Sequence, residues 1–450
     1  MMTIDDIRKQ VADQPDRHVK VGVFDLDGVM RGKYLSAQKF LSALEGGLGF
    51  CDVVLGWDVN DQLYDNVAFT GWHTGYPDAP VRLLPESVRT LPLEDNRLFC
   101  LGEFADGAEA LCPRGLLRRV LARAADMGFA VCAGFEYEFL VFEETAASAS
   151  DKNYRDLTPL APGNFGYSVL RNCEHSDFYE ALLSGCTALD IALEGLHEET
   201  GPGVLEAAIT VDEGLAAADK AALFKTFSKV IAGNQGKILT FMAKCDQDAP
   251  GQGGHIHVSL HHKDDGPAFF DETQEAGISK VMRAFIAGQQ RFMPEFLALM
   301  APTVNSFTRL VPGYWAPTSA TWGIENRTCA LRAIPGSAKA QRVEMRVPGA
   351  DANPYLALAA ALAAGLAGIA QGLEPDDPVR GNAYDCAVGG ERQLPATLWE
   401  AAQRLKASNV TRDWLGDAFV EHFAASREWE EREFRRHVTD WERARYFEII

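Results

Sequence analysis

Residues 129–142 read FAVCAGFEYEFLVF, and no other segment indicates the fold as clearly. Charged and aromatic side chains alternate within it, so Glu136 and Glu138 fall on one face of a strand and three aromatic rings on the other. The aromatic face predicts a central strand that packs against helices. On a central strand the polar face is also enclosed, so the two carboxylates must be paired or bound to something.

Three further segments show the same alternation of polar and apolar residues. Their polar members are His255 and His257 around Ile256, Arg332 after Leu331, and the series Arg342, Glu344 and Arg346. Together the four segments predict one concavity that is rich in charge. The alternative is four independent strand faces exposed to solvent.

The residue types in these segments suit phosphoryl transfer. Carboxylates and imidazole are ligands for Mg²⁺ or Mn²⁺, and arginines bind carboxylate and phosphate groups through paired hydrogen bonds. Metal ions and arginines that face one cavity are what phosphoryl transfer requires. The spacing in Gly233-Asn234-Gln235-Gly236-Lys237 is too short for a P-loop, and no GxGxxG sequence opens a helix after a strand. A nucleotide would therefore bind without either of these phosphate-binding turns.

The pattern along the chain predicts two domains with a boundary at about residue 110. Residues 1–110 are β-rich, with strands predicted at Val19–Asp27 and Val53–Asp58. A helix is predicted from Pro113 to Gly128. Strands and helices then interleave through residues 111–450, which predicts an α+β catalytic domain. The expected strands are 129–142, 254–260 and two within 328–347, and the expected helices are 215–231, 277–300 and 353–371.

The composition of the chain excludes some classes of partner and location. The 450 residues include 43 Lys plus Arg and 63 Asp plus Glu, a net charge of −20, which argues against nucleic acids and anionic membranes as partners. Residues 355–370 are apolar but too short and too rich in Ala and Gly to span a bilayer. The first ten residues lack the features of a secretory signal, and nine cysteines without a CxxC pair fit a reducing compartment. We therefore expect a cytoplasmic protein.

The chain resembles the glutamine synthetase family over nearly all of its length. The resemblance rests on motifs in family order, namely Glu136-Tyr137-Glu138, His-x-Glu-x-Gly-Pro-Gly-x-x-Glu at 197–206, Gly-His-Ile-His at 254–257, residues 305–313, Asn326-Arg327, residues 342–346 and Asn353-Pro354-Tyr355. It implies a small N-terminal β-grasp-like domain and a large catalytic domain with a curved antiparallel sheet flanked by helices. It also implies a homo-oligomeric ring, a dodecamer of two stacked hexamers, with active sites between neighbouring subunits.

The resemblance also implies the substrates and the roles of individual residues. ATP would phosphorylate glutamate with the help of two divalent metals, and an amine would then displace the phosphate. By motif position, Glu138, Glu199 and Glu206 would hold one metal, and Glu136, His255 and Glu344 the other. His257 and Arg342 would contact the nucleotide, Arg327 and Arg332 the transferring phosphate, Arg309 and Arg346 the glutamate carboxylates, and Gly251 the amino acid.

One position departs from the ammonia-using members of that family. Where their loop carries a Glu that accepts a proton from ammonium, this chain has Trp315, whose indole cannot accept one. A Trp at this place resembles the branch that joins glutamate to organic amines, such as γ-glutamylpolyamine synthetases. Asp58 is the candidate for an aspartate that reaches the amine site across a subunit boundary.

Two other functions stay open at this stage. One is an ordinary glutamine synthetase in which Trp315 only packs, and the other is a non-catalytic ring scaffold. Ethanolamine, a polyamine, an alkylamine and an aromatic amine all remain candidates for the acceptor.

Overall fold

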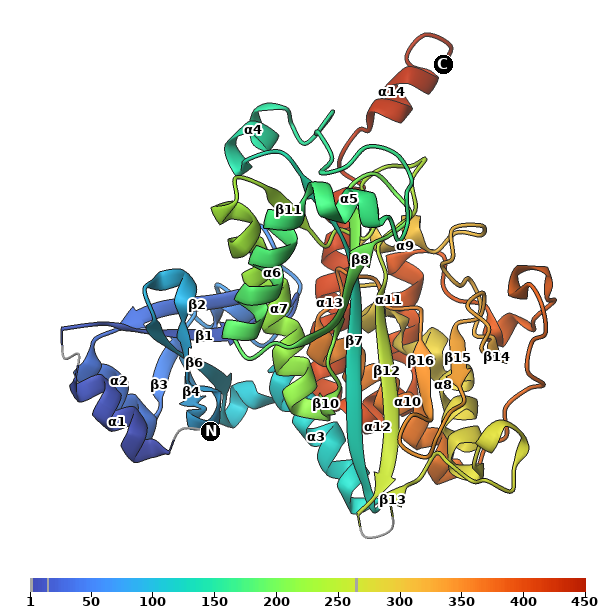
Figure 1. Cartoon of the computed structure of the whole chain (residues 1–450), viewed down its shortest axis with the longest axis horizontal. Helices are drawn as coiled ribbons and strands as arrows, with labels where there is room; N and C mark the ends of the chain where they lie inside the picture. Colours follow the sequence, from blue (N-terminus) through green and yellow to red (C-terminus); the bar gives the residue numbers. More distant parts are fainter. Residues whose placement is uncertain (1–2, 14–15, 264–265) are drawn as a thin grey trace.

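The computed structural model describes residues 3–13, 16–263 and 266–450. Two sheets organise the chain (Figure 1). The first has the order β2-β1-β6-β4-β3, with β5 paired to β6, and β1 and β6 run parallel. Its strands are β1 (Val19–Phe24), β2 (Met30–Leu35), β3 (Leu48–Cys51), β4 (Asp78–Leu83), β5 (Arg89–Leu91) and β6 (Arg97–Phe104), and α1 (Ile4–Ala12) and α2 (Ala37–Gly46) accompany them.

The strand predicted at Val53–Asp58 is wrong, because the chain forms a short 3-10 helix there, η1 (Asp52–Leu55). The Gly56 N–H donates to the Val53 carbonyl at 2.8 Å, and the buried Asp52 carboxylate accepts from the Thr70 hydroxyl at 2.7 Å. A short apolar run has no alternation that would separate a strand from a buried helical turn. Local hydrogen bonding therefore decided the structure of this segment.

The second sheet has ten strands and carries the motifs described above. Its order is β14-β15-β16-β12-β7-β9-β8, with β10 and β11 paired to β7 and β13 paired to β12. The predicted strand at 129–142 is confirmed as β7, and most of its neighbours run antiparallel to one another. The strands are β7 (Phe129–Phe142), β8 (Leu193–Glu198), β9 (Val204–Ile209), β10 (Asp212–Glu213), β11 (Ile238–Thr240), β12 (Gly254–His262), β13 (Gly266–Pro267), β14 (Trp322–Ile324), β15 (Leu331–Ile334) and β16 (Arg342–Met345).

Helices flank this sheet, as the α+β prediction requires (Figure 1). The helix expected at 277–300 begins only at Lys280, because the Ser279 hydroxyl accepts from the Met282 N–H and caps the helix there. The helices are α3 (Pro113–Asp126), α4 (Ala146–Asp151), α5 (Val169–Glu174), α6 (Ser176–Ala188), α7 (Gly214–Asn234), α8 (Lys280–Met300), α9 (Ser306–Arg309), α10 (Pro354–Gln371), α11 (Leu398–Ala407), α12 (Asn409–Leu415), α13 (Asp417–Phe434) and α14 (Asp440–Tyr446).

The helices α8 and α10 touch backbone to backbone in the core. A Cβ on Gly288 would lie 2.3 Å from the Ala364 carbonyl oxygen, and one on Gly368 would lie 2.3 Å from that of Ala284. Among the described residues, α10 is the helix that is long and apolar enough to cross a membrane, yet 83% of it is buried inside the protein. Its apolar composition is therefore explained by its place in the core.

The helix α13 connects the C-terminal part of the chain to the first sheet. Arg427 on α13 pairs with Asp27 at 2.8 Å and donates to the Pro302 carbonyl at 2.8 Å. The His422 ring on the same helix bonds the Leu55 carbonyl through Nε2 at 2.7 Å. These buried polar contacts fix the first sheet to the second part of the molecule, whereas α14 projects away from the body (Figure 1).

Candidate active site

Strand register brings the polar faces of the second sheet together. Glu136 on β7 lies opposite His255 on β12, and Glu138 lies opposite Glu206 on β9. Further across the sheet, Glu344 on β16 lies opposite both His257 on β12 and Arg332 on β15. Side chains of directly opposed residues project from the same face. The separate alternating segments therefore form one continuous polar face.

That face borders a cavity of about 330 Å³. Its lining includes all six expected metal ligands, the four arginines expected to contact phosphate and glutamate, Gly251 and Trp315. The full set is Glu136, Glu138, Tyr167, Glu199, Thr200, Val204, Glu206, Pro250, Gly251, His255, Arg309, Tyr314, Trp315, Arg327, Arg332, Glu344 and Arg346. His257, Arg342 and Asp58 lie outside this lining.

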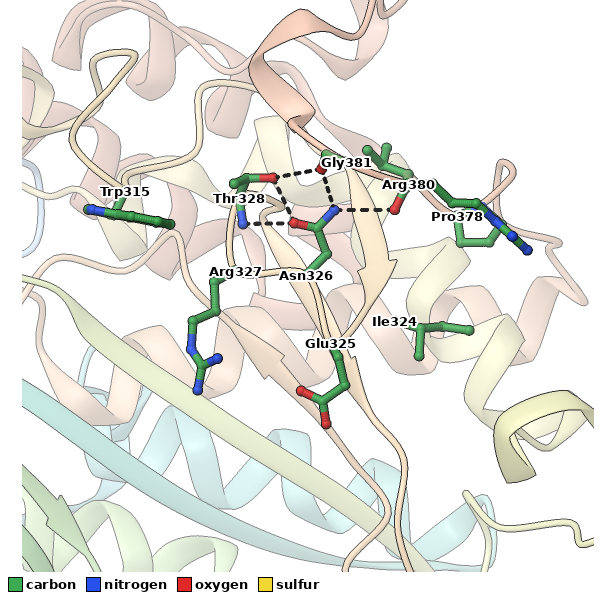
Figure 2. A pocket seen from close by; sticks show the side chains of 10 residues that line it. Trp315, Ile324, Glu325, Asn326, Arg327, Thr328, Pro378, Arg380 and Gly381 are labelled. Carbon is green, nitrogen blue, oxygen red and sulfur yellow. Dashed lines mark hydrogen bonds between the residues drawn. The ribbon is translucent and has the colours of Figure 1, made fainter.

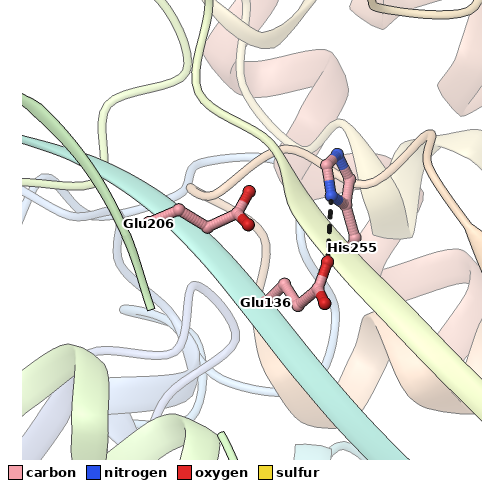
Figure 3. Close-up of side chains that lie close together, drawn as sticks. All are labelled: Glu136, Glu206 and His255. Carbon is pink, nitrogen blue, oxygen red and sulfur yellow. Dashed lines mark ion pairs between the residues drawn. The ribbon is translucent and has the colours of Figure 1, made fainter. Parts of the chain in front are cut away.

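One group of potential metal ligands surrounds His255. Its Nδ1 lies 3.7 Å from a carboxylate oxygen of Glu136 and 3.7 Å from one of Glu344. Ligand atoms of Glu136, Glu206 and His255 all lie within 4.8 Å of one another (Figure 3), as do those of Glu136, His257 and Glu344. Glu136 is common to these two groups, and Glu206, which the resemblance assigns to the other metal, lies beside His255 in this geometry.

A second group joins His197, Glu199 and Glu206. The His197 Nε2 lies 3.2 Å from Glu199 and 3.6 Å from Glu206, and the Tyr167 ring stacks on the imidazole with centroids 4.7 Å apart. His197 was not among the predicted ligands. Its position two residues before Glu199 was the available signal, because residues two apart on a strand share a face.

The charges in the cavity fit divalent cations. Burial and the carboxylates of Glu138, Glu136 and Glu199 raise the pKa of Glu206 to about 9. Burial opposes ionisation of Glu136 too, but the neighbouring imidazoles of His255 and His257 outweigh it and lower its pKa. Four carboxylates crowded beside one another form an oxygen-rich site of excess negative charge, which suits Mg²⁺ or Mn²⁺.

The arginines of the cavity differ in how many hydrogen bonds and ion pairs they already make within the chain. Arg309 is buried and donates to the carbonyls of Val347 at 2.8 Å and Arg346 at 3.1 Å. Arg332 bonds Glu344 at 3.0 Å and also bonds Glu325. Within residues 3–13, 16–263 and 266–450, Arg327 makes no hydrogen bond or ion pair. Its guanidinium group is thus free to bind an anion.

The two residues expected at the nucleotide lie beside the cavity on the same sheet. The Arg342 Nε donates to the His257 Nδ1 at 3.2 Å, and the other ring nitrogen of His257 lies 3.2 Å from a Glu136 oxygen. His257 therefore connects Arg342 to the carboxylate group. A ligand bound at Arg342 would lie next to the metal-ligand cluster.

Trp315 lies on the loop that closes one side of the cavity. Its side chain is 60% exposed and its φ is 61°, a backbone conformation that non-glycine residues rarely adopt. The loop is held at Ala316, whose carbonyl accepts from the Tyr384 hydroxyl at 3.0 Å, and at Tyr314, whose ring lies 4.3 Å from the Lys244 amine. Trp315 also lines a second cavity of about 630 Å³ (Figure 2).

Asp58 lies in the segment between β3 and β4, and its carboxylate accepts from the N–H groups of Asn60 and Gln62, each at 2.8 Å. Within one chain it therefore stabilises its own turn. Its expected contribution to a neighbouring subunit stays a prediction.

The chain belongs to the glutamine synthetase family, since the model of the family's catalytic domain matches residues 110–446. Relatives include the type-1 glutamine synthetase 2 of Dictyostelium discoideum, 44% identical over 99% of this chain and 86% of the relative. They also include a Pseudomonas glutamate–isopropylamine ligase, 37% identical over 96% of this chain and 95% of the relative. A gamma-glutamylethanolamide synthetase of Streptomyces coelicolor is 39% identical over 94% of this chain and 91% of the relative.

Solved structures named GmaS, one with ADP and one without ligand, match the fold with a TM-score of 0.84. They are 27% identical to this chain and cover 98% of it and 99% of their own length. The family resemblance and the α+β fold are thus confirmed, and the chain is a ligase of the glutamine synthetase type.

Proposed function

We propose that this enzyme joins an organic amine to the γ-carboxylate of glutamate, with ATP as the source of energy. Trp315 carries the proposal. It lines the catalytic cavity, its indole cannot accept a proton, and the family resemblance aligns it with the proton-accepting Glu of the ammonia-using members. An indole face that borders both cavities is instead suited to the carbon part of an amine.

The roles of the other residues follow from their chemistry. Bound at the carboxylate clusters, Mg²⁺ would neutralise the phosphate oxygens of ATP and the developing charge. Arg327 and Arg332 would stabilise the transferring phosphoryl group, and Arg309 and Arg346 would bind the carboxylates of glutamate. The amine nitrogen would then attack the γ-carbonyl carbon of γ-glutamyl phosphate. The new C–N bond would form as the C–O bond to phosphate breaks, and the surplus proton of the nitrogen would pass to the departing phosphate or to water.

Relatives support both an organic amine and ammonia. Two relatives carry the names of amine ligases, at 37% and 39% identity, whereas the relative at 44% identity is a type-1 glutamine synthetase. Ammonia is therefore the second candidate acceptor. A scaffold without activity is disfavoured, because all six expected metal ligands are present and line one cavity.

We also propose the assembly and location that the family resemblance implies. Chains would form a homo-oligomeric ring, a dodecamer of two stacked hexamers, in which Asp58 of each chain contributes to a neighbour's amine site. The described cysteines are free thiols, which supports a cytoplasmic location. Analytical ultracentrifugation would test the assembly, and a monomer that retains full activity would contradict it.

The decisive experiment measures phosphate release from ATP with glutamate, Mg²⁺ and a panel of amines that includes ammonium. The proposal predicts turnover with an organic amine and a much lower kcat/KM with ammonium. Ammonium as the best acceptor would establish a glutamine synthetase with a different proton acceptor. Absence of turnover across ammonium, alkylamines, ethanolamine, polyamines and aromatic amines would favour the scaffold.

A further inference from the structure

Arg309, which lines the catalytic cavity, is the last residue of the four-residue helix α9. A helix this short is not stable by itself, because its first turn fixes several backbone angles in exchange for few hydrogen bonds. Contacts with other segments must therefore hold α9 in place. These contacts determine how precisely the guanidinium group of Arg309 is presented to the cavity.

Asp351 holds the beginning of α9 through two hydroxyl groups. Its Oδ2 accepts from the Ser306 hydroxyl at 2.5 Å and from the Thr303 hydroxyl at 3.0 Å. Each hydroxyl oxygen also accepts from the backbone of the other residue, the Ser306 Oγ from the Thr303 N–H at 3.0 Å and the Thr303 Oγ1 from the Ser306 N–H at 3.1 Å. One carboxylate thus connects all the hydrogen bonds that cap this turn.

The end of α9 is attached to the same stretch of chain. The guanidinium group of Arg309 donates to the carbonyls of Arg346 and Val347, and Asp351 follows them in the sequence. Residues 346–351 therefore hold α9 at both ends. The two carbonyls use only part of the donors of the guanidinium group, which leaves further N–H groups for a carboxylate ligand.

The residues that precede α9 have partners of their own. The Val304 N–H donates to a carboxylate oxygen of Glu430 at 3.0 Å, and the Asn305 side chain exchanges two hydrogen bonds with the backbone of Lys244, each at 2.9 Å. Asp351 differs from these partners because it reaches Ser306, the first residue of the helix itself. We therefore expect its loss to displace Arg309 without unfolding the segment.

The surroundings of Asp351 give it no other hydrogen-bonded role. Burial raises its pKa, whereas the Ser306 hydroxyl and the nearby Lys225 and Arg309 act in the opposite direction. Its Oδ1 is buried and has no hydrogen-bond partner in the part of the chain that the structure describes. Burial of a carboxylate is costly unless hydrogen bonds compensate it, and here the compensating side-chain bonds come from Thr303 and Ser306.

We infer that Asp351 is a positioning residue for glutamate. Through Thr303 and Ser306 it fixes α9, and α9 presents Arg309 to a carboxylate of the amino acid. Asp351 itself lies outside the lining of the catalytic cavity, so it acts through Arg309. This inference rests on the proposed function, in which Arg309 binds glutamate.

The first test compares the Michaelis constants of the substrates. Asp351→Ala should raise the KM for glutamate about tenfold, because Arg309 loses its fixed position. The KM for ATP and for the acceptor should stay within about twofold, and kcat within about threefold, since only a binding contact is removed. Phosphate release with the best acceptor of the amine panel gives these constants, and thermal unfolding shows whether the variant is folded.

The matched control is Asp271→Ala. The carboxylate of Asp271 also accepts from a threonine hydroxyl, that of Thr273 at 2.7 Å, but it lies outside the lining of the catalytic cavity. Its loss should leave the KM for glutamate unchanged. Asp351→Asn keeps an oxygen that can accept from the Thr303 and Ser306 hydroxyls, so it should bring the KM for glutamate back to within about threefold of the unmodified enzyme.

The second test asks whether Asp351 acts through Ser306. Ser306→Ala removes the shorter of the two hydroxyl contacts and should raise the KM for glutamate about fivefold. The double variant should have a KM no higher than that of Asp351→Ala alone, because both changes break the same contact. If Asp351→Ala does not fold, Ser306→Ala and Asp351→Asn provide the test.

The outcomes for the variants decide the inference. An unchanged KM for glutamate in folded Asp351→Ala would overturn it, as would equal increases in the KM of every substrate. Asp351→Asn that is as impaired as Asp351→Ala would overturn the role of the hydroxyl contacts. Additive effects in the double variant would overturn the route through Ser306.

The proposed function can fail separately. Ammonium as the best acceptor would overturn the organic amine, and Asp351 would then be tested with ammonium in the same assay. If the unmodified enzyme releases no phosphate with any acceptor, calorimetric titration with glutamate in the presence of Mg²⁺ and a non-hydrolysable ATP analogue replaces the KM. A Kd about tenfold weaker in Asp351→Ala would support the positioning role, and an equal Kd would overturn it.

Discussion

Two regions of the molecule bury many charged side chains, and they differ in how fully those charges are paired within the chain. Around Arg427, each buried carboxylate has a partner within the chain, and Asp25 pairs with Arg31 at 2.8 Å. The guanidinium pairs with Asp27 at 2.8 Å and Glu430 at 3.5 Å, and it donates to the Tyr64 hydroxyl at 3.4 Å. We refer to Asp25, Asp27, Tyr64, Arg427 and Glu430 as the Arg427 cluster.

In the catalytic cavity, carboxylates and guanidinium groups lie together but are only partly paired. Glu206 faces three other carboxylates, and the exposed Arg327 makes no hydrogen bond or ion pair within the described part of the chain. Buried charges that a protein leaves unmatched are costly unless a ligand completes them. The comparison teaches that the Arg427 cluster serves the fold, whereas the cavity is arranged for cations and anions that come from outside.

The largest expected effect concerns the cavity. Glu136→Ala removes a ligand atom common to two of the potential metal groups, and phosphate release at millimolar Mg²⁺ should fall about a thousandfold. Steady-state phosphate release would measure this, with circular dichroism to show that the variant is folded. Glu143→Ala, an exposed carboxylate just beyond β7, is the control and should retain activity. Full activity in Glu136→Ala would remove Glu136 from the metal ligands.

The next effect concerns the Arg427 cluster. Arg427→Met leaves Asp27 and Glu430 buried without their partner, so the free energy of unfolding should fall by about 3–5 kcal/mol. Urea unfolding would measure the loss. The control is Arg432→Met on the same helix, where the partly exposed pair with Asp65 should contribute less than about 1 kcal/mol. Equal losses in the two variants would contradict the comparison.

A pH-dependent effect of intermediate size is expected from His422. Burial lowers its pKa from 6.5 to about 4, so between these values the unfolded chain binds a proton that the folded chain does not. The contribution of His422 is complete above pH 6.5, and falling pH should remove about 3 kcal/mol of stability by pH 4.

His422→Gln keeps a side-chain donor for the Leu55 carbonyl but cannot titrate, so it should weaken this pH dependence. Urea unfolding at pH 7, 5.5 and 4.5 would reveal the difference in slope. The control is His437→Gln, at an exposed position after α13, which should leave the slope unchanged. An unaltered slope in His422→Gln would show that other groups cause the acid sensitivity.

The smallest expected effect concerns the loop of the cavity. Trp315→Glu restores a proton acceptor and removes apolar surface, so the ratio of kcat/KM for ammonium to that for an alkylamine should rise about tenfold. Trp399→Glu, at a partly exposed position on α11, serves as the control. An unchanged amine profile would mean that Trp315 only packs.

The catalytic strands could be predicted from sequence because their pattern is local and regular. Aromatic and charged residues alternate through β7, and its observed bounds are those expected. Pairing between strands is not local, however. Glu138 lies opposite Glu206 and Glu136 opposite His255, and this register determines which ligands become neighbours. The sharing of Glu206 between two groups could therefore not be derived from spacing along the chain.

Other structural features could not be predicted, because the sequence around them contains no pattern that indicates them. The Arg427 cluster joins residues that are 400 positions apart in the sequence. The segment at Asp52–Leu55 forms a 3-10 helix that the Gly56 N–H closes onto the Val53 carbonyl, and a short apolar run does not reveal such a turn. The sequence did contain a signal for His197, because it lies two residues before Glu199. The ligands in this motif were nevertheless assigned to the carboxylates alone.

The contact between α8 and α10 has a consequence for how this sequence can vary. At Gly288 and Gly368 the two backbones leave no space for even one methyl group. Alanine and leucine elsewhere on α10 can exchange volume with their neighbours, since apolar cores accept substitutions that conserve total volume. No such exchange is available at the two glycines. A scan of α10 with apolar residues would therefore find tolerance interrupted at residue 368 and at Gly365, where a Cβ would lie 2.2 Å from the Phe285 ring, and a matching intolerance on α8 at residue 288.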